Sequence, residues 1–292
     1  MSLINLHVPF DAALSDVTFA AAFEANVQTA INEDVGSGDV TGLLISDSTK
    51  VKARMIVREA AVLCGAPWFE AVMLRCYPEI QIQWHYAEGD LMTADSAVCE
   101  IEAPARALLT AERSALNFLQ LLSGVATKTH RYVDLVAGCK AAILDTRKTI
   151  PGLRLAQKYA VRVGGGKNQR LALYDGILIK ENHIAAAGGI KAALNAAFSL
   201  KANVSVQIEV ENIAELTEAL EAGAKSILLD NFDLTMMREA VRLSAGQAML
   251  EASGGIDDSS VRAIAETGVD RISVGSLTKD IKAIDFSLRI LD

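Results

Sequence analysis

The chain has 292 residues, a formal net charge of −8 and 51% hydrophobic residues. The apolar content excludes an intrinsically disordered chain, and a total of four cysteines excludes a disulfide scaffold. The acidic balance argues against nucleic acid or an anionic membrane surface as the main partner. This length allows either one large barrel or two domains.

Neither the cysteines nor the histidines follow the spacing of metal ligands. The sequence contains no CxxC pair, so we expect reduced thiols in a reducing compartment rather than a zinc site. The first residues show no basic start followed by a long apolar stretch, and no uncharged apolar run is long enough to span a bilayer. These features predict a soluble cytoplasmic protein.

The first third of the chain predicts a small α+β domain. Its strand-like runs, between about residues 50 and 104, are VKARMIV, AAVLCG, EIQIQWHYA and SAVCEIEA. One helix-sized stretch, APWFEAVMLRC, interrupts them. From Arg106 to about Val136 helix breakers are almost absent, and apolar residues nearly encircle the predicted helix, which indicates burial or a seam between domains.

The rest of the chain alternates between apolar strands and helical stretches. The predicted strands are AILD, GILIK, VQIEV, SILLD, MLEAS and RISVG. The last four begin near residues 206, 226, 248 and 270, a spacing typical of βα units in a parallel sheet, either doubly wound or closed as a barrel. Asn212 and Glu215 predict a capping box for one helix, which Gly223 ends.

Polar residues gather where these strands end, which in a βα barrel is the edge that carries the active site. One or two such residues are consistent with surface loops, whereas polar residues at the same end of six successive strands indicate a site. They are Asp145, Thr146, Arg147, Lys148, Lys180, Glu181, Asn182, His183, Glu209, Glu211, Asp230, Asn231, Glu251, Ser253 and Ser276.

The segment from Asp145 to Glu181 is basic within an acidic chain, with eight basic and three acidic residues. This concentration predicts a small polyanionic ligand, because Arg offers forked donors and Lys a point charge to carboxylates and phosphates. We interpret one subset, spaced by four, as the solvated face of a helix: Arg154, Lys158 and Arg162. A second subset lies at strand ends and is interpreted as functional: Arg147, Lys148 and Lys180.

Two glycine-containing strand ends predict a phosphate site. They are Ser253-Gly254-Gly255 and Val274-Gly275-Ser276. Glycine lets the backbone approach a phosphate closely, and the following helix offers unpaired N–H groups. Each motif alone is weak, but phosphate sites after the last two strands are common in barrel enzymes.

Glu209 and Asp230 end adjacent predicted strands, so their carboxylates should lie side by side. Such a pair beside phosphates most often holds Mg²⁺, directly or through water. It could equally favour a developing cation on a sugar, or only neutralise Lys148 and Lys180.

Arg113 has two interpretations. If its helix begins near Thr110, a cation in the first turn opposes the helix dipole and an anionic ligand or partner subunit compensates. If the helix begins at about Arg106, Arg113 is simply exposed. Trp84, His85 and Tyr132 are interpreted as packing residues.

Residues 145–184, DTRKTIPGLRLAQKYAVRVGGGKNQRLALYDGILIKENHI, resemble the signature of quinolinate phosphoribosyltransferases. The similarity extends in the same order to EDVGSGDVT, TAERSALNFLQLLSGVAT, QIEVEN, LLDNF, EASGGI and ISVGSLTK. It therefore covers nearly the whole chain. The DTRKT and KENH elements together are highly specific.

The resemblance implies that quinolinate and phosphoribosyl pyrophosphate give nicotinate mononucleotide, pyrophosphate and carbon dioxide, with Mg²⁺, in NAD biosynthesis. It implies an N-terminal α/β sandwich-like domain, residues 1–117, followed by an incomplete TIM-like α/β barrel, residues 118–292, whose last helix packs back on the first domain. It also implies a homodimer, or a higher assembly built from it, in which each active site borrows Arg113 from the neighbouring subunit.

The resemblance also implies roles for individual residues. Those at quinolinate and pyrophosphate are Arg113, Thr146, Arg147, Lys148, Gln169, Arg170, Lys180 and His183. Those in catalysis are Lys148, Lys180, Glu209 and Asp230, the two carboxylates also lying near the ribose and Mg²⁺. Those at the 5′-phosphate are Ser253, Gly254, Gly255, Val274, Gly275 and Ser276.

One position departs from the family pattern. Members usually have a histidine where this chain has Gln169, and an amide cannot become a cation near neutral pH. Positive charge opposite the dicarboxylate is then lower or supplied by Lys167. We expect altered affinity rather than lost activity, because Arg147 and Arg170 remain.

Three alternatives are kept open. A nicotinate-type phosphoribosyltransferase without decarboxylation would need only one carboxylate clamp, and the density of Arg and Lys favours a dicarboxylate. A Schiff-base aldolase would use Lys180 as its nucleophile. A non-catalytic binding paralogue is disfavoured because the charged strand-end set is intact apart from Gln169.

Overall fold

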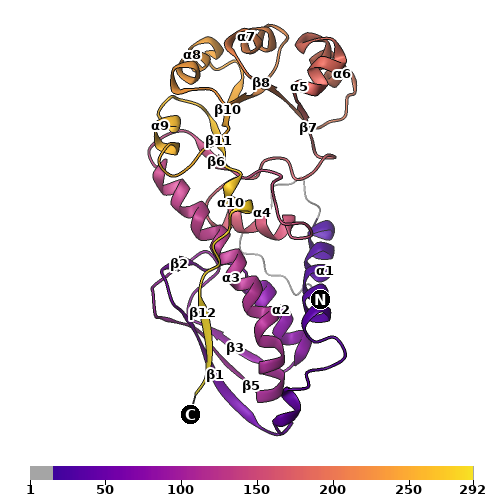
Figure 1. Cartoon of the computed structure of the whole chain (residues 1–292), viewed down its shortest axis with the longest axis vertical. Coiled ribbons are helices and arrows are strands. Elements are labelled where there is room, and N and C mark those ends of the chain that lie inside the picture. Colours follow the sequence, from indigo (N-terminus) through magenta and orange to yellow (C-terminus); the bar gives the residue numbers. More distant parts are fainter. Residues whose placement is uncertain (1–15, 292) are drawn as a thin grey trace. The chain divides into compact units, whose positions relative to one another are not determined.

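The computed structural model describes residues 16–291, which form two compact units (Figure 1). Unit 1 contains the described residues up to His130, then Ile150–Gly165 and the segment from Asp280 onward. Unit 2 contains Arg131–Thr149 and Gly166–Lys279. No helix among the described residues is long and apolar enough to cross a membrane. The initial segment, for which the sequence predicts no export signal, lies outside this range.

Unit 1 is built on an antiparallel four-stranded sheet with the order β12-β1-β5-β3. Its strands are β1 (Lys50–Val57), β3 (Gln81–Trp84), β5 (Ala97–Pro104) and β12 (Phe286–Ile290). A second small sheet pairs β2 (Ala61–Val62) with β4 (Leu91–Met92). Each strand-like run predicted for this region contains a strand.

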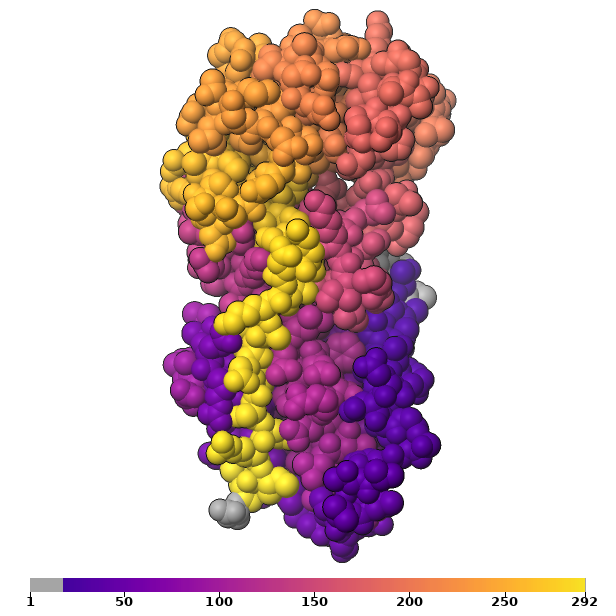
Figure 2. Space-filling model, viewed as in Figure 1, coloured from indigo at the N-terminus to yellow at the C-terminus, as the bar shows by residue number. Residues whose placement is uncertain are grey.

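The chain ends in a strand of unit 1 rather than in a helix. β12 pairs antiparallel with β1, with Ala53 opposite Ile290 and Val57 opposite Phe286. Figure 2 shows the C-terminal segment as a yellow band on the surface of unit 1. The first unit's sheet is therefore completed by the last residues of the chain.

The helices of unit 1 follow the predicted pattern closely. They are α1 (Asp16–Asp34), η1 (Gly42–Leu44), α2 (Ala66–Cys76), α3 (Ala105–Leu135) and α4 (Arg154–Val163). The last turn of α3, from Arg131, belongs to unit 2. The start of α2 is capped from a distance, because the Glu88 carboxylate accepts hydrogen bonds from the N–H groups of Gly65 (2.8 Å) and Ala66 (3.1 Å).

An aromatic cluster ties α1, α2 and α4 together in unit 1. The ring centroids of Phe19 and Phe23 lie 5.9 and 5.0 Å from that of Trp68, and the Tyr159 ring lies 5.4 Å from it. Trp68 is completely buried. Ring packing at these distances adds to the free energy of burying the aromatic surface.

Lys158, next to Tyr159 on α4, is also completely buried. The interpretation of its helix face as solvated is therefore wrong at this position, and Arg154 and Arg162 are half-buried. Spacing by four places residues on one face of a helix, but it does not say whether that face meets solvent.

Unit 2 is a six-stranded sheet in the order β6-β11-β10-β9-β8-β7, and every neighbouring pair is parallel. The strands are β6 (Ala142–Leu144), β7 (Gly176–Ile179), β8 (Ser205–Val210), β9 (Ser226–Asp230), β10 (Met249–Ser253) and β11 (Arg271–Ser273). β6 and β7 stand at opposite edges, so the barrel is incomplete, as expected. All strands of this sheet that were predicted are present.

Helices α5–α9 cover the outer face of this sheet (Figure 1). The helices of unit 2 are α5 (Glu181–Ala187), α6 (Ile190–Ser199), α7 (Ile213–Glu221), α8 (Leu234–Ser244), α9 (Val261–Ala265) and α10 (Ser276–Lys279). At the start of α7, Asn212 Oδ1 accepts the Glu215 N–H at 3.0 Å, as predicted. The Glu215 carboxylate reaches one residue further back, to the Glu211 N–H at 2.8 Å. Because the strands are parallel, their carboxyl ends meet at one edge.

Candidate active site

Two carboxylates and a lysine meet at the ends of β7, β8 and β9. Lys180 Nζ lies 3.0 Å from Glu209 Oε2 and 3.4 Å from Oε1. Burial raises the pKa of Glu209, Lys180 opposes that rise, and the nearby charge of Asp230 adds to it. The structure therefore brings the predicted carboxylates close enough to repel each other, and Lys180 offsets only part of their charge.

The turn after β9 is packed against the loop after β10. Asn231 Nδ2 donates to Asp230 Oδ2 at 2.9 Å, and the Asn231 N–H donates to Ser253 O at 3.0 Å. A Cβ on Gly254 would lie 2.2 Å from Asn231 Oδ1, and Gly254 has φ +104°. Only glycine fits this close approach without strain. A steric requirement therefore explains the glycine at position 254, in addition to any role at a phosphate.

The loops after β6 and β11 are also in contact. The exposed Lys148 side chain crosses Gly275, where an added Cβ would lie 3.1 Å from Lys148 Cδ and 3.6 Å from Thr146 Oγ1. The Lys148 N–H donates to Thr146 Oγ1 at 3.1 Å, and Thr278 Oγ1 donates to Lys148 O at 2.9 Å. A lysine ammonium is thus held beside the predicted phosphate loop Val274–Ser276.

Arg147 and Arg170 form a pair of neighbouring guanidinium groups. Burial and the charge of Arg147 lower the pKa of Arg170, which Asp175 partly opposes. Arg170 Nη1 donates to Gly176 O at 3.0 Å. Arg147 Nε is buried and has no hydrogen-bond partner among the described residues. Two like charges with an orphaned buried donor fit an anionic ligand, because such donors rarely stay unpaired.

Gln169 reaches into a buried polar network instead of leaving its amide open. Its Nε2 donates to Gln207 Oε1 at 2.8 Å and to Glu251 Oε1 and Oε2 at 3.1 and 3.2 Å. Gln207 Nε2 donates to Glu251 Oε2 at 3.0 Å. Sequence reasoning missed Gln207, although a single polar residue inside the apolar run VQIEV was a usable signal.

The remaining predicted residues have identifiable places. His183 is exposed, and its Nδ1 accepts the Lys180 N–H at 3.0 Å, which fixes the first turn of α5. Lys167 has an exposed side chain, and its backbone bridges to Leu144 at the edge of β6. Tyr132 is buried, which agrees with its interpretation as a packing residue, and this burial raises the pKa of its hydroxyl.

Arg113 lies in unit 1, on the exposed surface of α3. Because α3 begins at Ala105 directly after β5, Arg113 is not in the first turn. The argument from the helix dipole is therefore wrong, and the earlier helix start is correct. The remaining predicted site residues lie in unit 2.

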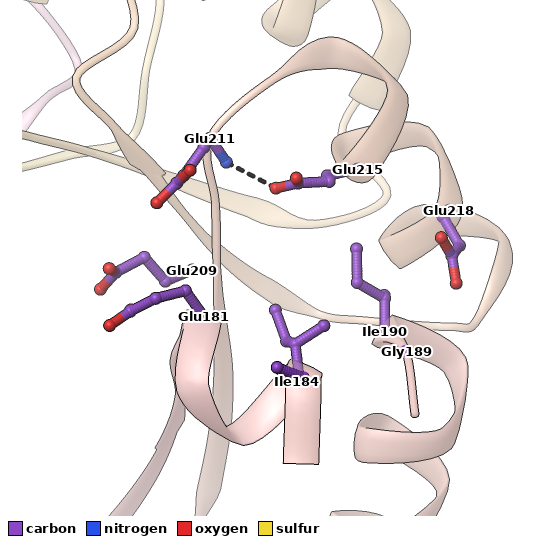
Figure 3. A pocket seen from close by; sticks show the side chains of 9 residues that line it. Glu181, Ile184, Gly189, Ile190, Glu209, Glu211, Glu215 and Glu218 are labelled. Atoms are coloured by element: carbon purple, nitrogen blue, oxygen red, sulfur yellow. Dashed lines mark hydrogen bonds between the residues drawn. The ribbon is translucent and has the colours of Figure 1, made fainter. Parts of the chain in front are cut away.

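A cavity of about 310 Å³ opens beside Glu209. Figure 3 shows Glu181 and Glu209 on one side of it and Glu211, Glu215 and Glu218 around the rest. Among the residues described, no three His, Cys, Asp or Glu side chains converge as a metal site. A divalent cation at Glu209 and Asp230 would therefore take its other ligands from substrate and water.

Comparison with known proteins finds relatives along the whole described chain. The family profile “Quinolinate phosphoribosyl transferase, N-terminal domain” matches residues 16–123, and “Quinolinate phosphoribosyl transferase, C-terminal domain” matches residues 125–289. A Bacillus subtilis protein named “Probable nicotinate-nucleotide pyrophosphorylase (carboxylating)” is 39% identical over 88% of this chain and 90% of its own. “Quinolinate phosphoribosyltransferase (decarboxylating) 1b” of Nicotiana tabacum is 38% identical over 90% of this chain and 81% of its own length.

The fold agrees with these sequence relatives. The structure of the nicotinate-nucleotide pyrophosphorylase from Francisella tularensis superposes with a TM-score of 0.91 at 46% identity. The match covers 93% of this chain and 96% of that one.

Proposed function

The chain belongs to the quinolinate phosphoribosyltransferase family, and we propose that it transfers the phosphoribosyl group of phosphoribosyl pyrophosphate to quinolinate. The products are nicotinate mononucleotide, pyrophosphate and carbon dioxide, a step in the synthesis of NAD. The names of its relatives, which specify quinolinate with decarboxylation or, for the reverse direction, carboxylation, support this reaction over transfer to nicotinate. A cytoplasmic location, which the sequence predicts, is part of the proposal.

The observation that carries this proposal is the pair Arg147 and Arg170. Their like charges repel each other, and Arg147 Nε is buried without a hydrogen-bond partner in the part of the chain that the structure describes. A pyridine dicarboxylate would relieve both penalties, since guanidinium groups bind carboxylates through charge-assisted hydrogen bonds. We assign the quinolinate carboxylates to these two side chains.

The phosphates of the second substrate fit the loops after β6, β10 and β11. Lys148 beside Gly275 supplies a cation, and the glycines of the loops Ser253–Gly255 and Val274–Ser276 let the backbone approach a phosphate closely. We assign the pyrophosphate to Lys148 and Lys180 and the 5′-phosphate to the two loops.

Glu209 and Asp230 fit a magnesium ion, because a divalent cation would relieve the repulsion between them. Mg²⁺ is commonly held by one or two carboxylates plus substrate phosphates. When bound, it would offset the negative charge that grows on the leaving pyrophosphate.

The reaction can proceed without a dedicated base. The pyridine nitrogen attacks C1 of the ribose while the bond from C1 to the pyrophosphate oxygen breaks. Glu209 and Asp230 favour the positive charge that develops at C1, and lysine side chains favour the negative charge that grows on the oxygens of the leaving pyrophosphate. The ring nitrogen, now positive, stabilises the electron pair that departing carbon dioxide leaves on the adjacent ring carbon, and that carbon then uses the pair to bind a proton. Positioning two polyanions supplies much of the rate enhancement.

The alternative of a Schiff-base aldolase is disfavoured by the environment of Lys180. Its nitrogen is engaged 3.0 Å from the Glu209 carboxylate, an ion pair that uses the ammonium form. Schiff-base formation requires the neutral amine.

The proposal includes a homodimer in which Arg113 of the partner subunit completes each site. Its support is the exposed position of Arg113 on α3, in a different unit from the remaining predicted site residues. Mixing the Arg113→Ala and Lys148→Ala variants tests this arrangement. In a mixed dimer, one site has both Lys148 and the partner's Arg113, so the mixture should regain activity that neither variant has alone. Mixtures that stay as inactive as their components would count against it.

The main test mixes the protein with phosphoribosyl pyrophosphate, Mg²⁺ and either quinolinate or nicotinate, and follows nicotinate mononucleotide and carbon dioxide. We expect product from quinolinate alone, with equimolar carbon dioxide and a requirement for Mg²⁺. Arg147→Met should lose saturation by quinolinate, whereas Arg242→Met, an exposed arginine of the same unit, should match the wild type. Product from nicotinate instead would show that the protein is a nicotinate-type phosphoribosyltransferase, which does not decarboxylate its substrate.

A further inference from the structure

The polar network around Glu251 has no part in the reaction as written above. Glu251 lies on β10 with no exposed surface. Its carboxylate accepts hydrogen bonds from two neutral amides, Gln169 at 3.1 and 3.2 Å and Gln207 at 3.0 Å. A buried carboxylate is costly unless its oxygens are satisfied, so these two glutamines hold Glu251 in place and are held by it.

The amide of Gln169 has no hydrogen left for a substrate carboxylate. Its Nε2 carries two hydrogens; one points to Gln207 Oε1 at 2.8 Å and the other is shared by the two Glu251 oxygens. Its Oε1 accepts the Arg170 N–H at 2.6 Å. An oxygen turned toward a dicarboxylate would repel it, so direct substrate binding by this residue is chemically unfavourable here.

The same contacts fix the backbone that carries Arg170. The Gln169 N–H donates to Asp145 Oδ1 at 2.9 Å, and Asn168 Nδ2 donates to Asp145 Oδ2 at 2.6 Å. Asp145 directly follows β6 and is completely buried. The segment 168–170 is therefore tied on one side to β6 and on the other, through the Gln169 side chain, to β8 and β10.

We propose that Gln169, Gln207 and Glu251 act together as a positioning unit for Arg170, and that Gln169 does not touch the substrate. The unit sets the direction from which Arg170 meets a carboxylate. Gln207, deep in β8, becomes a residue on which recognition of the dicarboxylate depends. This inference rests on the proposed function, because it takes Arg170 as a ligand of quinolinate.

The test is a double-mutant cycle with Gln169→Met and Gln207→Met, which keep side-chain volume and remove the amides. We expect each variant to raise KM for quinolinate by roughly tenfold, the effect of one buried hydrogen bond. The double variant should show about the same rise, because either change breaks the same unit. KM for phosphoribosyl pyrophosphate and kcat should stay within about twofold, a split that general destabilisation would not produce.

Thr267→Val is the matched control, since it removes a buried hydrogen bond of unit 2, from Thr267 Oγ1 to Ile264 O at 2.6 Å. It should lower the melting temperature without changing either KM. If Gln207→Met does not fold, Gln207→Asn withdraws the amide by one methylene and carries the same expectation.

Two results would overturn the inference while leaving the proposed function intact. The first is an unchanged KM for quinolinate when residue 207 is altered. The second is a double variant whose KM rises by the product of the single effects, about a hundredfold, which would mean that Gln169 binds the substrate independently. Wild-type protein that turns over no quinolinate would overturn the proposed function itself, and the inference with it.

Discussion

Replacing Glu88 by glutamine should weaken unit 1 in a way that depends on pH. Glu88 is half-buried, and its two oxygens accept the N–H groups of Gly65 and Ala66 at the start of α2. In Glu88→Gln one oxygen becomes an NH₂ that faces an N–H, so one helix N–H loses its acceptor. A lost cap or buried acceptor costs about 1–2 kcal/mol, and at about 2–4 °C per kcal/mol for a domain of this size the melting temperature should fall by roughly 2–8 °C.

The pH dependence follows from the pKa of Glu88. Burial raises this pKa above its ordinary value of 4.5, against the lowering effect of the hydrogen bonds that the carboxylate accepts from the Gly65 and Ala66 N–H groups. The folded protein therefore binds this proton more tightly than the unfolded chain does. Relative to Glu88→Gln, the wild type therefore has its largest free energy of unfolding below pH 4.5. This difference decreases as the pH rises through the pKa of Glu88 in the folded protein. The stability gap between wild type and Glu88→Gln should shrink over this range.

Tryptophan fluorescence is the suitable assay. Both tryptophans of the chain, Trp68 and Trp84, lie in unit 1, so the signal reports that unit. Thermal unfolding at pH 4.5, 6 and 7.5 would be compared for wild type, Glu88→Gln and Glu33→Gln, the last an exposed glutamate on α1. The control should match the wild type within about 0.5 kcal/mol. A gap that widens with rising pH would refute the reasoning, because it would mean that the fold prefers the charged carboxylate.

Three further changes have clear expectations. Gly254→Ala places a Cβ 2.2 Å from Asn231 Oδ1 at φ +104°, so KM for phosphoribosyl pyrophosphate should rise roughly 5- to 150-fold from strain of about 1–3 kcal/mol; an unchanged KM would exclude this loop from the site. Trp68→Ala should cost about 3–5 kcal/mol of unfolding free energy, measured by urea denaturation, since the ring is fully buried beside Tyr159. Asp233→Ala should cost about 1 kcal/mol, measured by thermal unfolding, because Asp233 Oδ1 accepts two N–H groups at 2.8 Å.

The parallel sheet of unit 2 was predictable because its strands are short apolar runs separated by capped helices. Runs such as SILLD are buried on both faces, so their continuous apolar composition by itself predicts a strand of a parallel sheet. β12 was missed for a physical reason: it is an edge strand whose residues become more exposed toward its end, so its alternation is weak. β4 is too short to have a pattern of its own.

The site was predictable to the extent that parallel strands end at one edge. That rule brought Lys180, Glu209 and Asp230 together without any knowledge of side-chain contacts. It could not show that Gln169 turns inward to Gln207, because hydrogen bonds between distant strands depend on register. The burial of Lys158 was equally beyond reach, since a helical spacing says which residues share a face and not what covers it.

The position of β12 has a consequence for how the protein is made. β1 is synthesised before every strand of unit 2, whereas β12, one of its two neighbours in the sheet, is synthesised after all of them. Until then β1 presents an unpaired edge, the kind of surface at which nascent chains pair wrongly. Unit 2 has all of its strands before unit 1 does. A chain interrupted before residue 286 would therefore carry a complete parallel sheet and an incomplete first unit, which exposes truncated products to quality control.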